Sequence, residues 1–81
     1  MTTPRFRTGI IQRLHDSEIN CQVSTFFDGN FDWQIGDAMN GFVAEGSAQT
    51  FTEAERQLAA KACYLYPTSV FAQTYLDEMV H

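Results

Sequence analysis

The chain has 81 residues, of which 44% are hydrophobic and 14% aromatic, and it carries a net charge of −5 at pH 7. This length indicates one small domain, and the apolar content excludes an intrinsically disordered chain. The negative charge argues against non-specific binding to nucleic acid or to an anionic membrane. No apolar run reaches the length of a membrane span or of a signal peptide. The sequence therefore predicts a soluble cytoplasmic protein that does not bind membranes.

The first segment alternates apolar and polar residues, which predicts a strand over residues 5–14. A turn at Asp16 and Ser17 would join it to a second strand over residues 18–27. In that hairpin Leu14 lies opposite Ile19, so apolar residues of the two strands meet on one face of the sheet.

The stretch FFDGNF, residues 26–31, predicts a hairpin that leads into a third strand over residues 31–37. A two-residue loop would scatter the large apolar side chains over both faces, whereas a three-residue loop over residues 28–30 gathers them on one. Burial selects the three-residue loop, because a slip of one residue moves every side chain to the other face. Asn30 would take the left-handed conformation at its end. Phe27 then belongs to the core and Phe26 points to the opposite face.

The pair Asn40-Gly41 predicts a two-residue turn into a fourth strand over residues 42–49. In this register Trp33 faces Ala48, and Trp33 is expected to be a core anchor. Small residues opposite the largest ones leave room for a helix to cross the sheet. The inward-facing residues of this strand are Phe42, Ala44, Gly46 and Ala48.

The second half of the chain changes to a helical period. Thr52, with a glutamate three residues later, predicts a capped helix over residues 53–66, and a short helix over residues 70–79 follows with Ser69 as its cap. The predicted fold is α+β: a four-stranded antiparallel meander sheet packed on one face by a helix, plus a short C-terminal helix, in a single domain over residues 1–81.

No catalytic, metal-binding or cofactor-binding motif stands out. Cys21 and Cys63 fit neither a CxxC motif nor a zinc pattern and are expected to be buried, reduced thiols, with a disulfide or a reactive thiol as the alternatives. The run HDSE, residues 15–18, is expected to be a solvated turn. Paired catalytic carboxylates need a concave site, which a thin sheet with one helix offers poorly. The sequence therefore predicts a protein that is not an enzyme and needs no cofactor.

The face of the predicted sheet that points away from the helix is mostly polar and carries a few exposed apolar residues. It is interpreted as a set of scattered surface residues, as a contact surface for a partner or a second subunit, or as an arginine-flanked platform for stacked bases. The candidate interaction residues are Arg7, Ile11, Arg13, Phe26, Gln34 and Val43.

The segment GDAMNGFVAEGSAQTFTEAERQLAAKACYLYP, residues 36–67, is similar to the sheet-and-helix half-domains of HicB-type antitoxins. It lacks their glycine-rich, proline-bearing loop, and the chain has no DNA-binding tail. The run HDSEIN…FFDGNFDWQIGD…NGFVAEG resembles small uncharacterised bacterial proteins over about residues 9–72. This second resemblance supports the fold and implies no activity.

Three functions are compatible with these observations. The first is a non-enzymatic protein-interaction or regulatory module, as a monomer or a homodimer, that uses the exposed sheet face or the edge of the last strand. The second is an acidic inhibitor that competes with nucleic acid for a basic site on another protein. The third is a nucleic-acid binder that uses a strip of Arg7, Arg13 and Phe26, which the overall charge opposes.

Overall fold

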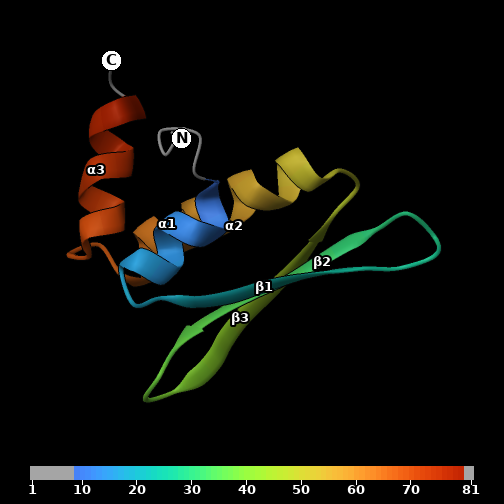
Figure 1. The fold of residues 1–81 in the computed structure, drawn as a ribbon, viewed down its shortest axis with the longest axis horizontal. Helices are drawn as coiled ribbons and strands as arrows, with labels where there is room; N and C mark the ends of the chain where they lie inside the picture. The colour runs from blue at the N-terminus through green and yellow to red at the C-terminus, as the bar shows by residue number, and fades with distance from the viewer. Residues whose placement is uncertain (1–8, 80–81) are drawn as a thin grey trace, which may run out of the picture.

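The computed structural model describes residues 9–79 and has an α+β fold. The three strands form one antiparallel sheet in the order β1-β2-β3, and the three helices lie on one face of it (Figure 1). The class and the antiparallel sheet are as predicted, but the sheet has three strands in this part of the chain and not four. The elements are α1 (Ile10–Asp16), β1 (Asn20–Thr25), β2 (Phe31–Asp37), β3 (Gly41–Ala48), α2 (Phe51–Leu65) and α3 (Val70–Met79).

Helix α1 replaces the greater part of the predicted first strand, so the prediction of a strand over residues 5–14 was wrong for Ile10 onwards. Residues 5–8 lie outside the described residues. Ile10, Ile11 and Leu14 occupy one side of the helix and pack on the core. A helix of seven residues is only marginally stable by itself, so its packing against β1, α2 and α3 stabilises it.

The predicted hairpin turn after α1 is instead a helix C-cap. The amide of Glu18 donates to the carbonyl of His15 at 2.9 Å, and the amide of Ile19 donates to that of Leu14 at 2.9 Å. This pair of bonds is a Schellman motif, with Glu18 in the left-handed conformation at φ 65°. Leu14 and Ile19 are both buried in the core, so they share its interior through the cap and not through a strand pair.

The loop between β1 and β2 spans residues 26–30, and its tip, residues 27–29, lies one position earlier than the predicted three-residue loop. The amide of Phe26 donates to the carbonyl of Asn30, and Gly29, not Asn30, takes the left-handed conformation at φ 90°. Glycine adopts that conformation without steric cost. Phe27 therefore sits at the loop tip, fully exposed, and the prediction that it belongs to the core was wrong.

The register between β1 and β2 differs from the prediction by two residues, so the side chains within the paired strands keep their predicted faces. Val23 pairs with Trp33, and Thr25 pairs with Phe31. A shift of two preserves the alternation of a strand, whereas a shift of one would reverse it. Phe26 accordingly points away from the helices, as expected.

A β-bulge separates the two halves of the β2–β3 ladder. Ile35 pairs with Ala44, whereas Gly36 pairs with Phe42, which leaves Val43 as the extra residue. A Cβ atom on Gly36 would lie 1.8 Å from the carbonyl oxygen of Gly41, so only glycine fits at this approach. The bulge leaves Phe42 partly exposed, so the prediction that it faces inward was wrong. The predicted two-residue turn was also wrong, because Asp37 pairs with Gly41 and residues 38–40 form the loop between them.

Helix α2 begins two residues before its predicted start. The hydroxyl of Thr50, not of Thr52, accepts the amide of Glu53 at 3.1 Å and caps the helix. The helix ends at Leu65, and Pro67 follows its C-cap. Its buried side consists of Ala54, Leu58, Ala59 and Ala62.

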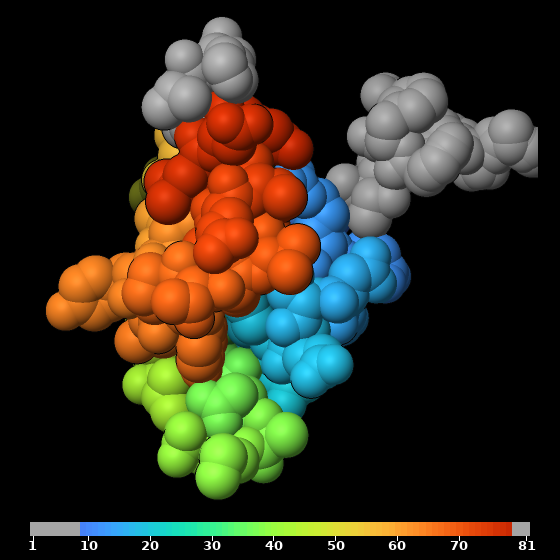
Figure 2. All heavy atoms as spheres, turned by 90° about the vertical axis from the view of Figure 1, so that its left-hand side faces the viewer, coloured from blue at the N-terminus to red at the C-terminus, as the bar shows by residue number. Residues whose placement is uncertain are grey.

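Helix α3 spans the range that the sequence predicts and packs against α2 and α1 (Figure 2). The hydroxyl of Ser69 accepts the amide of Ala72 at 3.1 Å, which is the expected cap. Phe71 is buried and its ring stacks on that of Tyr75, with centroids 5.3 Å apart. Together with Trp33 and Ile35 from the sheet, these rings complete a core between the sheet and the helices.

Candidate functional site

The candidate site is the face of the sheet opposite the helices, which we call the outer face. No described helix covers it (Figure 1). The alternation of the strands places polar side chains on it, with a few apolar ones among them. Its residues include Gln22, Ser24, Phe26, Asp32, Gln34, Phe42, Val43, Glu45 and Ser47.

The outer face is hollowed where the three strands lie side by side. The hollow has a volume of about 490 Å³, and the ring of Phe26 forms part of its wall. Trp33 and Gly46 are also among its lining residues, although the indole of Trp33 points to the helices and donates to Gln57. The polar side chains that line it are Ser24, Asp32, Gln34, Glu45 and Ser47.

Two cross-strand hydrogen bonds hold the polar side chains of this face in place. The side-chain Nε2 of Gln22 donates to Oε1 of Gln34 at 2.8 Å, and the hydroxyl of Ser47 donates to Oδ1 of Asp32 at 3.0 Å. Both bonds join neighbouring strands, so they pre-order the surface before any partner arrives. A pre-ordered surface loses less side-chain entropy on binding.

Three apolar side chains stand out from this polar surface. Phe26 is 50% exposed, Phe42 46% and Val43 48%. Phe42 and Val43 lie together at the bulge, and they line a second small hollow with Gln34 and Glu45. The sequence predicted Phe26 and Val43 here but placed Phe42 inside. Glycine at position 36, inside a strand pattern, was the available signal for a bulge.

The charge of the sheet is entirely negative. Residues 17–49 contain no Lys, Arg or His. The described Lys and Arg side chains are all on helices: Arg13 and Arg56 pair with Glu78 and Glu53, and Lys61 lies over the ring of Tyr64. The outer face therefore presents a negative potential to an approaching partner. The carboxylates of this segment are Glu18, Asp28, Asp32, Asp37 and Glu45.

The structure brings together only half of the predicted interaction residues. Gln34 and Val43 lie on the sheet and Phe26 directly follows β1, whereas Ile11 and Arg13 lie on α1, where Ile11 packs on the core. Arg7 lies outside the described residues. The predicted strip of arginines beside Phe26 depended on the N-terminal strand, which is a helix from Ile10 onwards.

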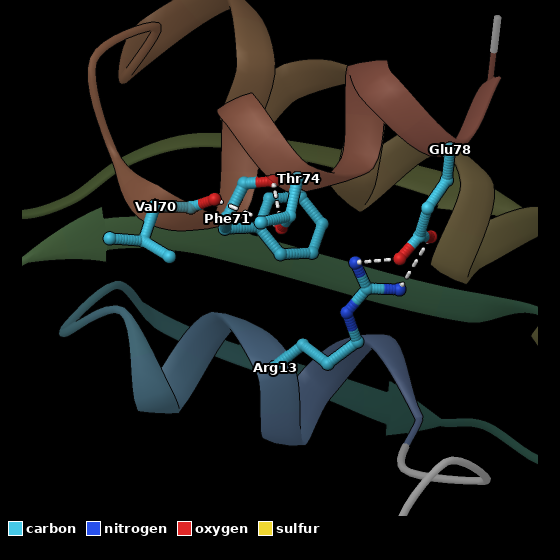
Figure 3. Close-up of polar contacts among 5 residues, drawn as sticks. All are labelled: Arg13, Val70, Phe71, Thr74 and Glu78. Carbon is cyan, nitrogen blue, oxygen red and sulfur yellow. Dashed lines mark hydrogen bonds and ion pairs between the residues drawn. The ribbon is translucent and has the colours of Figure 1, made fainter.

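Arg13 is fully engaged in holding α3 against α1 (Figure 3). Its guanidinium donates to both carboxylate oxygens of Glu78, at 3.1 and 3.2 Å. It also lies over the rings of Phe71 and Tyr75, 5.3 and 5.9 Å from their centroids. A guanidinium that pairs and stacks at once acts as a clamp between two helices.

The two cysteines are free thiols in the structure. Burial raises the pKa of Cys21 to about 11 and also raises the pKa of Cys63. A thiol with a raised pKa is a poor nucleophile at neutral pH. Within residues 9–79, no three His, Cys, Asp or Glu side chains are close enough together to hold a metal ion.

None of the helices in residues 9–79 has both the length and the apolar character needed to cross a membrane. The chain matches no protein-family model, no curated protein and no solved structure. The geometry and charge of the outer face are therefore the basis for the functional proposal.

Proposed function

We propose that the chain is a non-enzymatic protein-interaction module that binds its partner through the outer face of the sheet. The observation that carries this proposal is the exposure of Phe26, Phe42 and Val43 on a face that no described helix covers. Exposed apolar side chains with a polar rim are typical of protein-binding surfaces. The polar side chains that form the cross-strand hydrogen bonds of this face are the polar rim around these apolar residues.

The charge of the face favours a partner with basic residues. Asp32 and Glu45 lie beside the apolar side chains, and residues 17–49 carry no compensating cation. Such a surface attracts lysine and arginine, and it repels nucleic-acid phosphates and a second copy of itself. We therefore favour another protein over a homodimer or a nucleic acid, and we propose that binding takes place in the cytoplasm.

A second candidate function follows from the same carboxylates. The chain would act as an acidic inhibitor that occupies a nucleic-acid-binding site on a basic protein. This function predicts that binding weakens steeply with salt and that an oligonucleotide displaces the chain. Binding governed by the apolar side chains would instead survive at moderate salt.

The experiment compares two sets of surface variants. Phe26→Ser with Val43→Ser removes apolar surface from the outer face, and Leu76→Ser removes a side chain of similar exposure, 51%, from α3. A photo-crosslinking residue at position 34 identifies the partner in cell extract, and the same residue at position 73 on α3 is the control. We expect a protein adduct at position 34 that the double variant loses and Leu76→Ser keeps. Equal adducts at both positions, or an adduct that survives in the double variant, would reject the proposal.

A further inference from the structure

The outer edge of β3 is open to another strand. In residues 9–79, β3 pairs only with β2, and no segment pairs with its other side. An edge strand presents unpaired N–H and C=O groups, and proteins commonly block it with proline or lysine. Neither residue occurs in β3, and beyond the bulge at Val43 the stretch Ala44–Ala48 pairs regularly with β2.

On the helix side of the sheet, the small inward residues of β3 leave room for the ring of Trp33. The indole of Trp33 crosses β3 at Gly46: a Cβ atom at position 46 would lie 2.3 Å from its Cζ2 atom. The Nε1 atom of Trp33 donates to Gln57 of α2 at 2.7 Å, which fixes the ring. A hollow of about 320 Å³ adjoins the ring, lined by Trp33, Gln57, Ala60, Lys61 and Tyr64.

The orientation of α2 places this hollow on the β3 side of the sheet. Gly9, which precedes α1, lies beside Glu55, so α1 occupies that side of α2. Residues two apart on a helix lie on nearly opposite sides, so Gln57 faces away from α1. Lys61 and Tyr64 continue the same stripe as Gln57. Since α1 packs on β1, at the far edge of the sheet, this stripe lies on the β3 side.

We propose that the β3 edge accepts an extended segment of a partner protein in which apolar residues alternate with lysine or arginine. The segment would add a strand beside Ala44–Ala48. Its apolar side chains would enter the hollow against Trp33, and its basic side chains would point to the outer face, beside Glu45. This inference rests on the proposed function and specifies how the partner is held.

Charge complementarity identifies the occupant. A strand added at this edge exposes alternate side chains to the outer face, where Glu45 and Asp32 supply negative charge. A second copy of β3 would bring another Glu45 carboxylate to a face that already lacks cations. A segment in which basic and apolar residues alternate pairs with the negative outer face and also fills the hollow on the other face. A second copy of β3 would form only the backbone hydrogen bonds.

The test uses two peptides of equal composition. Acetyl-KLKLKLK-amide alternates as the proposal requires, and acetyl-LLLKKKK-amide cannot place its leucines on one side of a strand. We expect the alternating peptide, at up to about 1 mM, to slow amide exchange in Ala44–Ala48 and shift the indole N–H signal of Trp33. The block peptide should bind at least about tenfold more weakly. No protection of β3, or equal binding of both peptides, would overturn the inference.

Variants separate this inference from the proposed function. Ala60→Phe places a ring over the hollow from an exposed position on α2 and should abolish the protection of β3 by the alternating peptide. Leu76→Ser, on α3, should leave that protection within about twofold of wild type, because this residue lies on another element and does not line the hollow. Protection that survives Ala60→Phe would overturn the edge inference alone. Failure of the crosslinking at position 34, with β3 still protected, would reject the outer face alone.

Discussion

The hydroxyl of Tyr66 donates a 2.7 Å hydrogen bond to Oδ2 of Asp37, and so ties the end of α2 to the β2–β3 turn. The same carboxylate accepts the amides of Met39 and Asn40 within that turn. The bond from Tyr66, followed by those from Asn40, lowers the pKa of Asp37 below its ordinary value of 3.8. Burial, followed by the Asp37 carboxylate, raises the pKa of Tyr66 to about 12.

These shifts predict the pH dependence of folding stability. Since the folded pKa of Asp37 is lowered, its contribution is complete above pH 3.8 and is lost as the pH falls through the folded pKa. Since the folded pKa of Tyr66 is raised, its contribution is complete below pH 10.0 and is lost as the pH rises to about 12. Tyr66→Phe should reduce both losses, as measured by urea unfolding across the pH range, and the part of the alkaline loss that remains belongs to the buried Cys21 thiol, whose pKa is raised to about 11. Tyr64→Phe, at a mostly exposed ring, is the control and should retain both losses.

Glu18→Gly should stabilise the protein. Glu18 is the one described non-glycine residue with positive φ, at 65°, and it closes the Schellman motif of α1. Glycine adopts this conformation without the steric cost of about 1 kcal/mol that a residue with a side chain has. The greater freedom of glycine in the unfolded chain offsets part of this gain in stability. We expect a rise in the free energy of unfolding of roughly 0.5 kcal/mol by urea denaturation. Asn20→Gly, in the adjacent strand, should lower it instead.

The cap of α2 can be tested with a matched pair of threonines. Thr50→Ala removes the hydroxyl that accepts the Glu53 amide and should cost about 1 kcal/mol of unfolding free energy. Thr52→Ala alters an exposed residue inside the first turn and should change it by less than about 0.5 kcal/mol. Thermal or chemical denaturation of both variants gives the comparison, and a larger loss for Thr52→Ala would contradict the assigned cap.

The Arg13 clamp should require arginine and not merely positive charge. Arg13→Lys keeps the charge but loses both the two-pronged bond to Glu78 and the stacking on Phe71, so we expect a loss of about 1 kcal/mol. Amide exchange should accelerate in α3 before it does so in the sheet. Arg56→Lys, at an exposed pair with Glu53, is the control and should cost less than about 0.5 kcal/mol. Equal losses would show that the paired bonds and the stacking of Arg13 together add nothing beyond an exposed ion pair.

Gly46→Ala should displace the tryptophan. The new methyl group would overlap the indole of Trp33 and strain its bond to Gln57, with an expected cost of about 1–3 kcal/mol. Trp33 is the only tryptophan, so its fluorescence reports the displacement directly. Gln49→Ala, at an exposed position just after β3, should leave the emission spectrum unchanged. An unchanged spectrum in Gly46→Ala would contradict the packing of the ring over β3.

The alternation of side chains in the sheet was predictable from the sequence. Val23, Trp33 and Ile35 share the inward face, and Phe26 and Gln34 share the outer one, as expected, although both predicted registers were off by two residues. A strand has a period of two, so burial of the large apolar residues selects the face without selecting the register. The helical period likewise identified the buried side of α2.

The candidate site was only half predictable, for the same reason. Phe26 and Val43 follow from alternation along their strands, whereas Phe42 reaches the outer face only through the bulge opposite Gly36. The hollow beside Trp33 also needed the structure, because the ring of Trp33 and residues of α2 form it together. No local pattern carries that information.

The sequence by itself determined the class of fold, the faces of the strands and the period of the main helix, because each depends on residues a few positions apart. Only the tertiary structure decided that Ile10–Asp16 is a helix, since its apolar residues suit either a strand or a short helix that is marginal alone. Packing against β1, α2 and α3 stabilises the helix, so Arg13 lies on α1 and pairs with Glu78, whereas the sequence predicts it on the sheet. Contacts between segments distant in the sequence therefore decided between strand and helix, which the local pattern of residues did not.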